Sequence, residues 1–152
     1  MKKLVAAGGT FDIIHKGHLA LLELAFSIGE HVIIGVSSDE FAKKRGKVVT
    51  NRFEDRVKRL KDILDKRYAN RYTITKLEED FGPALFKDDI EALVVSKETE
   101  EKGKLLNELR KERGLKPLEI VVMDMVLAKD GKPISSSRIK KGEIDPNGNL
   151  RL

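Results

Sequence analysis

The feature that most constrains how this chain folds is a glycine-rich segment, residues 8–18, which separates two different apolar patterns. The run before it, residues 4–7, is continuously apolar, as in a buried strand. The segment after it has apolar residues at helical spacing, namely Leu19, Leu22, Ala25 and Phe26. We therefore predict a strand–loop–helix corner, called the first corner below. Its free backbone N–H groups and positive helix end suit a phosphate group.

Two histidines, His15 and His18, lie three residues apart at the predicted helix start, so they share one face. Helix capping, zinc binding and phosphate binding are all open to such a pair. The pattern is not His-Glu-x-x-His, and Asp12 alone is a poor third ligand, so zinc is disfavoured. The segment also lacks the ending of a P-loop and the Gly-x-Gly-x-x-Gly of a dinucleotide fold. A phosphate-binding corner is the preferred interpretation.

Composition limits the class of protein. A chain of 152 residues is long enough for one domain, 1–152, and too short for two ordinary ones. The absence of cysteine excludes disulfides, thiolate catalysis and cysteine-bound metals. No apolar run approaches membrane-spanning length, so we expect a soluble cytoplasmic protein with no membrane partner. The net charge of +5 comes from interspersed Lys and Arg without a nucleic-acid motif, so we expect anionic small substrates and no nucleic acid. A composition that is 36% charged and rich in Lys and Glu is typical of heat-adapted proteins.

Strand and helix patterns alternate along the rest of the chain, which predicts an α/β fold with a parallel sheet. Further strands are expected at residues 31–36, 72–77, 92–96 and 118–123, with 72–77 peripheral because its apolar residues alternate. Helices are expected near 39–42, 52–65 and 96–113, and a short helical piece from Gly82. In the helix at 96–113 we expect three leucines on the inner side, Leu105, Leu106 and Leu109. Arg56 falls among the apolar positions of its helix, so its head group is either directed to a partner or solvated, and we expect solvation.

Polar segments beside these elements each allow a structural or a ligand-binding interpretation. The basic cluster 43–47, which follows the second strand, is either a solvated loop or a site for a substrate phosphate. Residues 96–99 either cap a helix or contact a ligand. The three serines before Arg138 supply more donors than a cap requires, which favours phosphate binding at 134–139. Residues from about 143 to 152 are polar, and we expect a frayed tail there.

The motif His15-Lys16-Gly17-His18, preceded by Gly-Gly-Thr-Phe-Asp, resembles the His-x-Gly-His signature of the nucleotidyltransferase superfamily. With Val-Val-Ser-x-Glu-Thr at 94–99 and Ile-Ser-Ser-Ser-Arg-Ile at 134–139, nearly the whole chain is similar to the archaeal and eukaryotic type of phosphopantetheine adenylyltransferase. The resemblance implies a Rossmann-like fold, with helices on both faces of a five-stranded parallel sheet in the order 3-2-1-4-5. It also implies transfer of AMP from ATP to 4′-phosphopantetheine, giving dephospho-coenzyme A and pyrophosphate, with substrate-bound Mg²⁺.

The resemblance also implies roles for the motif residues. His18 donates to the α-phosphate as charge develops, and Thr10 orients the incoming acceptor phosphate, which is also held by Lys44 or Lys47. The nucleotide is bound by residues of the three motifs, namely Gly9, Phe11, His15, Gly17, Ser96, Glu98, Thr99, Ser135, Ser136, Ser137 and Arg138. No general base is needed, because the attacking phosphate is already an anion. We name no protein ligand for the metal, because Mg²⁺ takes few protein ligands.

Two other interpretations remain open at this point. One is a sister nucleotidyltransferase, such as an FAD synthetase or a cytidylyltransferase. The other is a nucleotide-binding sensor without catalysis, which would not need both histidines and the serine–arginine segment. The oligomeric state is also open, with a monomer favoured over an oligomer.

Overall fold

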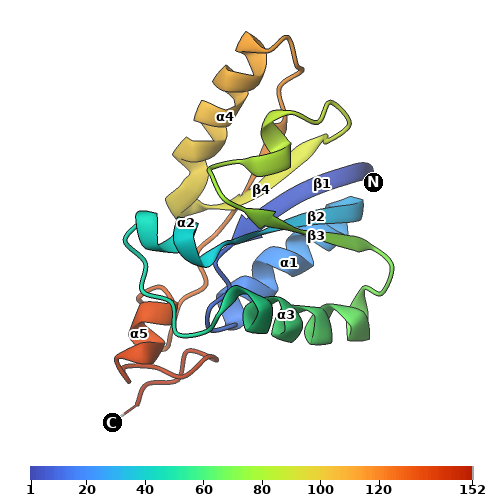
Figure 1. Ribbon diagram of the computed structural model, residues 1–152. Helices are drawn as coiled ribbons and strands as arrows, with labels where there is room; N and C mark the ends of the chain where they lie inside the picture. Colours follow the sequence, from blue (N-terminus) through green and yellow to red (C-terminus); the bar gives the residue numbers. More distant parts are fainter. Residues whose placement is uncertain (152) are drawn as a thin grey trace.

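The computed structural model describes residues 1–151, which form one five-stranded parallel sheet in the order β3-β2-β1-β4-β5 (Figure 1). The strands are β1 (Lys2–Gly9), β2 (Gly29–Ser37), β3 (Tyr72–Leu77), β4 (Ala92–Ser96) and β5 (Glu119–Met123). The helices are α1 (Lys16–Ile28), α2 (Asp39–Lys44), α3 (Phe53–Arg67), α4 (Glu100–Glu112) and α5 (Ser136–Lys140). Two short 3₁₀ helices are η1 (Gly82–Leu85) and η2 (Lys97–Thr99). The predicted α/β class and strand order are confirmed.

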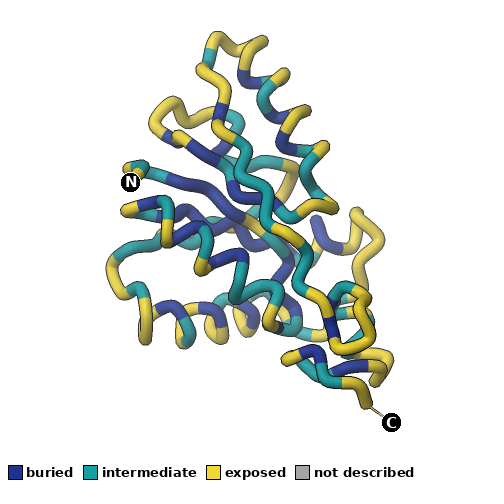
Figure 2. The backbone as a smooth tube through the Cα atoms, turned by 180° about the vertical axis from the view of Figure 1, so that it is seen from behind, coloured by how far each residue is buried: buried dark blue, intermediate teal, exposed yellow. Residues whose placement is uncertain are grey.

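Helices cover both faces of the sheet, as expected (Figure 1). Side chains of α1 and α3 pack on one face, where Leu22, Phe26 and Leu60 join the larger apolar cluster. A smaller cluster on the opposite face includes Ala84 of η1 and Leu106 of α4. The strands in the middle of the sheet are the most deeply buried part of the backbone, as Figure 2 shows. Such burial on both faces requires the continuous apolar runs seen in the sequence.

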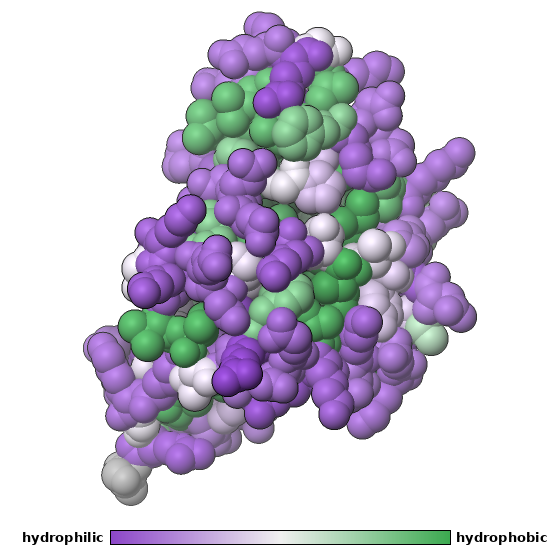
Figure 3. Space-filling model, viewed as in Figure 1, coloured by the Kyte–Doolittle hydropathy of each residue, from purple (hydrophilic) through white to green (hydrophobic). Residues whose placement is uncertain are grey.

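The inner face of α4 differs from the predicted one. Leu105 is 49% exposed, whereas Gly103, Leu106 and Arg110 are the buried residues of the helix. Gly103 lies so close to Ile120 that a Cβ would stand 3.0 Å from its Cγ2 atom. The helix approaches the sheet through this glycine, and the approach turns Leu105 outward. Figure 3 shows hydrophobic residues gathered beside α4, in the upper part of the view.

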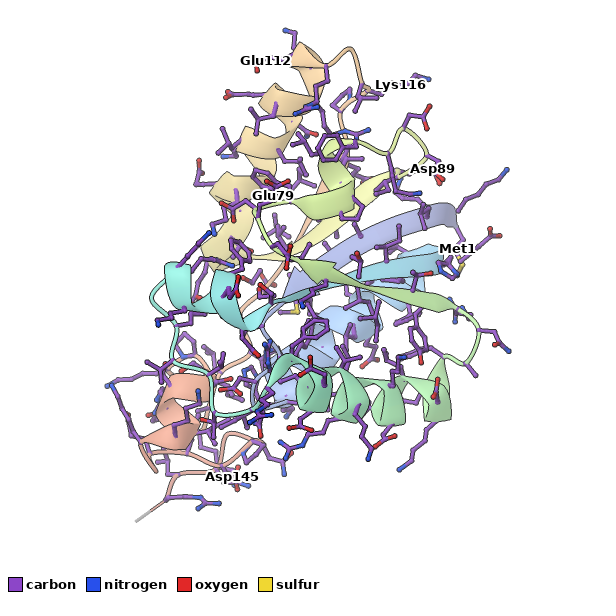
Figure 4. All side chains as sticks on the ribbon, in the orientation of Figure 1. Met1, Glu79, Asp89, Glu112, Lys116 and Asp145 are labelled. Carbon is purple, nitrogen blue, oxygen red and sulfur yellow. The ribbon has the colours of Figure 1, made fainter. Side chains whose placement is uncertain are left out.

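The end of the described chain, residues 143–151, is packed in the structure, where we expected a frayed tail; residue 152 lies outside the described part. Ile144 is fully buried beside Ala128 and Ile134. The Lys16 N–H, at the start of α1, donates to the Pro146 carbonyl at 2.9 Å. Asp145, labelled in Figure 4 near α5, accepts hydrogen bonds from the backbone of the following turn. The segment thus closes on the first corner. None of the helices within residues 1–151 has the length and apolar character of a membrane span.

Candidate active site

A cavity of about 780 Å³ opens at the carboxyl ends of the strands, between β1 and β4. The strand order reverses at this point, where open parallel sheets bind ligands. The cavity is walled by the first corner, the loop after α2, the start of α4 and the residues around α5. Segments that are distant in the sequence therefore meet around one space.

The structure brings most of the predicted site residues to this cavity. Those that line it are Gly9, Thr10, Phe11, His15, Gly17, His18, Lys47, Ser96, Glu98, Thr99, Ser135, Ser136 and Ser137. Lys44 and Arg138 do not line it. Both lysines are exposed, but Lys47, which follows α2, lines the cavity and Lys44 does not.

The first corner has an unusual backbone at Phe11, whose φ is 53° and whose ring is buried. A left-handed conformation costs a residue with a side chain roughly 1–2 kcal/mol, so it persists where its surroundings enforce it. The ring of Phe11 lies under His18, with 5.0 Å between ring centroids. It also fills the space beside Gly9, where a Cβ would meet the Phe11 Cε2 atom at 3.1 Å. Gly9 therefore allows the chain to fold back on itself.

The two histidines cap α1 and stack on each other. The Nδ1 atom of His15 accepts a hydrogen bond from the Gly17 N–H at 3.0 Å, and the Nδ1 atom of His18 accepts one from the His15 N–H at 3.2 Å. The rings stack with centroids 3.8 Å apart. Because each Nδ1 accepts, each neutral ring carries its proton on Nε2. Capping and ligand binding thus use different nitrogens, and the two interpretations of this pair are compatible.

Both imidazoles are neutral at physiological pH. Burial lowers the pKa of His15 to about 4. Burial also lowers the pKa of His18 to about 3, with help from the nearby His15 and Lys47 and against the effect of the Ile13 carbonyl. A neutral imidazole is a hydrogen-bond donor without a full charge. The pair therefore suits a phosphate whose charge increases during a reaction.

Arg56 is the main residue whose position the sequence did not reveal. Its side chain is fully buried, contrary to the expected solvation, and it donates hydrogen bonds to the Thr10 carbonyl at 2.7 Å and the Ser37 carbonyl at 2.8 Å. It also binds the Asn51 carbonyl and the Asp39 carboxylate. The signal was its place on the apolar face of a helix, where a charge is kept only if it has partners.

An ion pair between Asp12 and Lys140 joins the first corner to α5. The buried Asp12 carboxylate accepts from the Thr50 and Asn51 N–H groups at 2.9 Å each and forms an ion pair with Lys140. Burial alone would raise the pKa of Asp12, but these hydrogen bonds hold it below its ordinary value. Lys140 also donates to the Val48 carbonyl at 2.6 Å and lines the cavity. Asp12 is therefore charged and occupied by protein donors.

Arg138 faces away from the cavity, contrary to its expected place. Its guanidinium binds Asp130, Glu143 and the Pro133 carbonyl. Ser135 caps α5 through its hydroxyl, which accepts from the Arg138 N–H at 3.2 Å. The helix that starts here places Lys140, four residues after Ser136, on the serine side. This four-residue spacing in the sequence could have identified Lys140 as the cation that lies beside the serines.

The 3₁₀ helix η2, which leads into α4, is capped by its own residues. The Ser96 N–H donates to the Thr99 hydroxyl at 3.2 Å, and the two hydroxyls are also 3.2 Å apart. Both residues and Glu98 still line the cavity, so capping leaves them at the cavity wall. Lys47 also lines the cavity; burial lowers its pKa, with Arg45 and Lys102 acting in the same direction and Glu98 against them.

Comparison with known proteins identifies the family of the chain. Residues 6–142 match the family model described as cytidylyltransferase-like. The chain is 46% identical to the phosphopantetheine adenylyltransferase of Methanothermobacter thermautotrophicus, over 97% of this chain and 88% of the relative. It is 44% identical to that of Methanopyrus kandleri, over 93% of this chain and 90% of the relative. A crystal structure of a protein of unknown function from Archaeoglobus fulgidus has a TM-score of 0.72 at 34% identity, covering 89% of this chain and all of the other. The chain belongs to the cytidylyltransferase-like family and, within it, to the group of the archaeal phosphopantetheine adenylyltransferases.

Proposed function

We propose that this protein transfers the AMP group of ATP to 4′-phosphopantetheine, giving dephospho-coenzyme A and pyrophosphate. The observation that carries the proposal is the near full-length identity with archaeal enzymes of that name, in a chain whose three motifs meet at one cavity. The same relatives support a role in coenzyme A biosynthesis. We also propose that the chain acts as a single domain in the cytoplasm.

The reaction needs alignment and charge stabilisation. An oxygen of the acceptor phosphate bonds to the α-phosphorus while the bond from that phosphorus to the pyrophosphate oxygen breaks. Because the nucleophile is an anion, no side chain has to remove a proton. His18 donates its Nε2 proton in a hydrogen bond to the α-phosphate, Thr10 orients the acceptor phosphate, and Lys47 helps to hold that phosphate.

The other nucleotide phosphates bind beside the α-phosphate, at the α5 end of the cavity. His15, the N–H groups of the first corner and the hydroxyls of Ser136 and Ser137 are the donors there. We assign the cation of this end to Lys140, which lines the cavity, and not to Arg138. Ser96, Glu98 and Thr99 are proposed to contact the nucleotide at the start of α4.

Magnesium fits this arrangement as an ion bound to the substrate. Both oxygens of Asp12, the carboxylate of the first corner, already accept hydrogen bonds from protein groups. Mg²⁺ keeps several waters and is readily held by phosphate oxygens. Bound to the triphosphate, it supplies positive charge that offsets the charge of the departing pyrophosphate.

The test is pyrophosphate release from Mg-ATP with a panel of acceptors. We expect fast release with 4′-phosphopantetheine and little with FMN, nicotinamide mononucleotide or glycerol 3-phosphate, and CTP should replace ATP poorly. Fast release with FMN and none with phosphopantetheine would favour a sister enzyme. ATP binding without release with any acceptor would favour a sensor.

A further inference from the structure

One nitrogen of Arg56 joins the ends of two neighbouring strands. Its Nη1 atom donates both to the carbonyl of Thr10, just after β1, and to the carbonyl of Ser37, the last residue of β2. The Nε atom binds the Asn51 carbonyl at 3.0 Å, and the Nη2 atom binds Asp39 at 2.6 Å. The side chain is fully buried. A planar group with donors in fixed directions therefore sets how far apart these strand ends lie.

The same contacts hold the first corner on both sides of its left-handed residue. Thr10 is fixed by Arg56, while Asp12 is fixed by Asn51, whose N–H and side-chain amide both donate to it. Since Asn51 in turn accepts from Arg56, the two attachments form one network. Phe11, with its φ of 53°, lies between them. A non-glycine residue keeps such a conformation where its neighbours leave it no alternative.

The hydroxyls of the two residues joined by Arg56 have no protein partner. Within residues 1–151, Thr10 Oγ1 and Ser37 Oγ are the buried side-chain polar atoms without a hydrogen bond. Both residues line the cavity. Buried hydroxyls are normally satisfied, so a pair left open at a cavity wall indicates a ligand that completes them. Their backbone carbonyls, by contrast, are tightly held.

We propose that Arg56 is a positioning residue for the transfer step, which fixes the ends of β1 and β2 so that Thr10 meets the acceptor phosphate in the reactive geometry. The inference rests on the proposed function, since it gives the acceptor a phosphate. Arg56 itself does not line the cavity and acts through Thr10. Lysine at this position keeps the charge but cannot bind all four partners at once.

A double-mutant cycle between Arg56→Lys and Thr10→Ala tests the proposal. We expect Arg56→Lys to lower kcat roughly tenfold to a hundredfold, because small displacements of an orienting group have effects of this size. The Kd for ATP, measured by calorimetry, should stay within about twofold. In the Thr10→Ala background the same substitution should cost less than about threefold, because the residue through which it acts is gone. Equal factors in both backgrounds, or unchanged kinetics, would overturn the proposal.

Arg110 provides a matched control. It is equally buried and binds the carbonyls of Ala84, Lys87 and Lys116 on the other side of the sheet. Arg110→Lys should lower the melting temperature as Arg56→Lys does, with kcat per folded molecule unchanged. A matching loss of kcat in Arg110→Lys would show that the effect is one of general stability, against the proposal.

A milder variant and the parent enzyme separate the remaining outcomes. If Arg56→Lys does not fold, Asp39→Asn takes its place, because it weakens one contact of the guanidinium at a half-exposed carboxylate. It should lower kcat severalfold with ATP affinity kept, and an unchanged kcat would count against the proposal. A parent protein that releases no pyrophosphate from ATP and phosphopantetheine would refute the proposed function. An active parent with an additive cycle would refute the positioning role alone.

Discussion

Replacing Lys140 or Arg138 by methionine separates the cation that faces the cavity from the one that faces away. Lys140 lines the cavity beside Ser136 and Ser137, and its amine is held by Asp12 and the Val48 carbonyl. A charge-assisted hydrogen bond to phosphate contributes about 1.5–3 kcal/mol, so Lys140→Met should lower kcat/KM for ATP roughly ten- to a hundredfold. Arg138→Met should change it less than about threefold.

The two variants should be similar in stability, which makes them a matched pair. Lys140→Met leaves the buried Asp12 without its counter-ion but with the Thr50 and Asn51 donors. Arg138→Met leaves Asp130 and Glu143, which retain contact with water. We expect Lys140→Met, which unpairs a buried carboxylate, to cost about 1–3 kcal/mol, or very roughly 2–10 °C in melting temperature for a domain of this size, and Arg138→Met to lower the melting temperature by no more than that. Kinetics, and not stability, should distinguish them.

The assay is initial-rate pyrophosphate release with ATP varied and phosphopantetheine saturating, alongside thermal unfolding of the same preparations. A tenfold or greater loss in Arg138→Met with little change in Lys140→Met would refute the reasoning. That result would return the phosphate contact to Arg138, as the sequence suggested. Equal kinetic losses would show that the whole α5 segment shifts in either variant.

Three further predictions concern the histidines and the basic cluster. His18→Asn, which can still cap α1, should lower kcat by roughly a hundredfold with KM for ATP nearly unchanged; normal turnover would remove His18 from the reaction. The pKa values of His15 and His18 are lowered in the folded state to about 4 and about 3, so their contribution to stability is present above pH 6.5 and lost as the pH falls below it. In denaturant unfolding, the free energy of unfolding of the parent should fall by about 1.4 kcal/mol per pH unit for each histidine between pH 6.5 and about 4.5. A variant with asparagine at both positions should not show this loss. Parallel plots of unfolding free energy against pH for the two proteins would contradict the burial argument. Lys47→Ala should raise KM for phosphopantetheine, whereas Lys44→Ala should leave it unchanged. The reverse result would show that Lys44, and not Lys47, binds the acceptor phosphate.

The sequence was informative wherever one pattern decides one property. Continuous apolar runs predicted the buried strands, and the alternating run at Tyr72–Leu77 predicted the edge strand β3 with the bounds that the structure has. The first corner was predicted because a buried strand, a glycine-rich segment and a helical pattern follow one another directly. These are local properties, so no knowledge of distant contacts was required.

The errors concern properties that depend on distant partners. Whether Arg56 is solvated depends on two carbonyls that lie at the ends of other strands. Whether Arg138 reaches the cavity depends on Asp130, because the ion pair with this residue holds the guanidinium away from the cavity. The misplaced Leu105 has a similar cause, because the rotation of α4 is set by the close approach of Gly103 to β5 and not by the leucines alone. Hydrophobic periodicity identifies a face but does not say how closely a helix packs.

The packed end of the chain has a consequence for how the protein becomes active during synthesis. The N–H of Lys16, inside the histidine motif, donates a hydrogen bond to the carbonyl of Pro146, and Ile144 is buried next to the α5 segment. The ribosome makes the motif early and its partner much later. The sheet can begin to assemble while translation continues, but the first corner lacks this hydrogen bond until the segment around Pro146 has emerged. Enzyme activity on a nascent chain should therefore appear in one late step, well after the fold has begun to form.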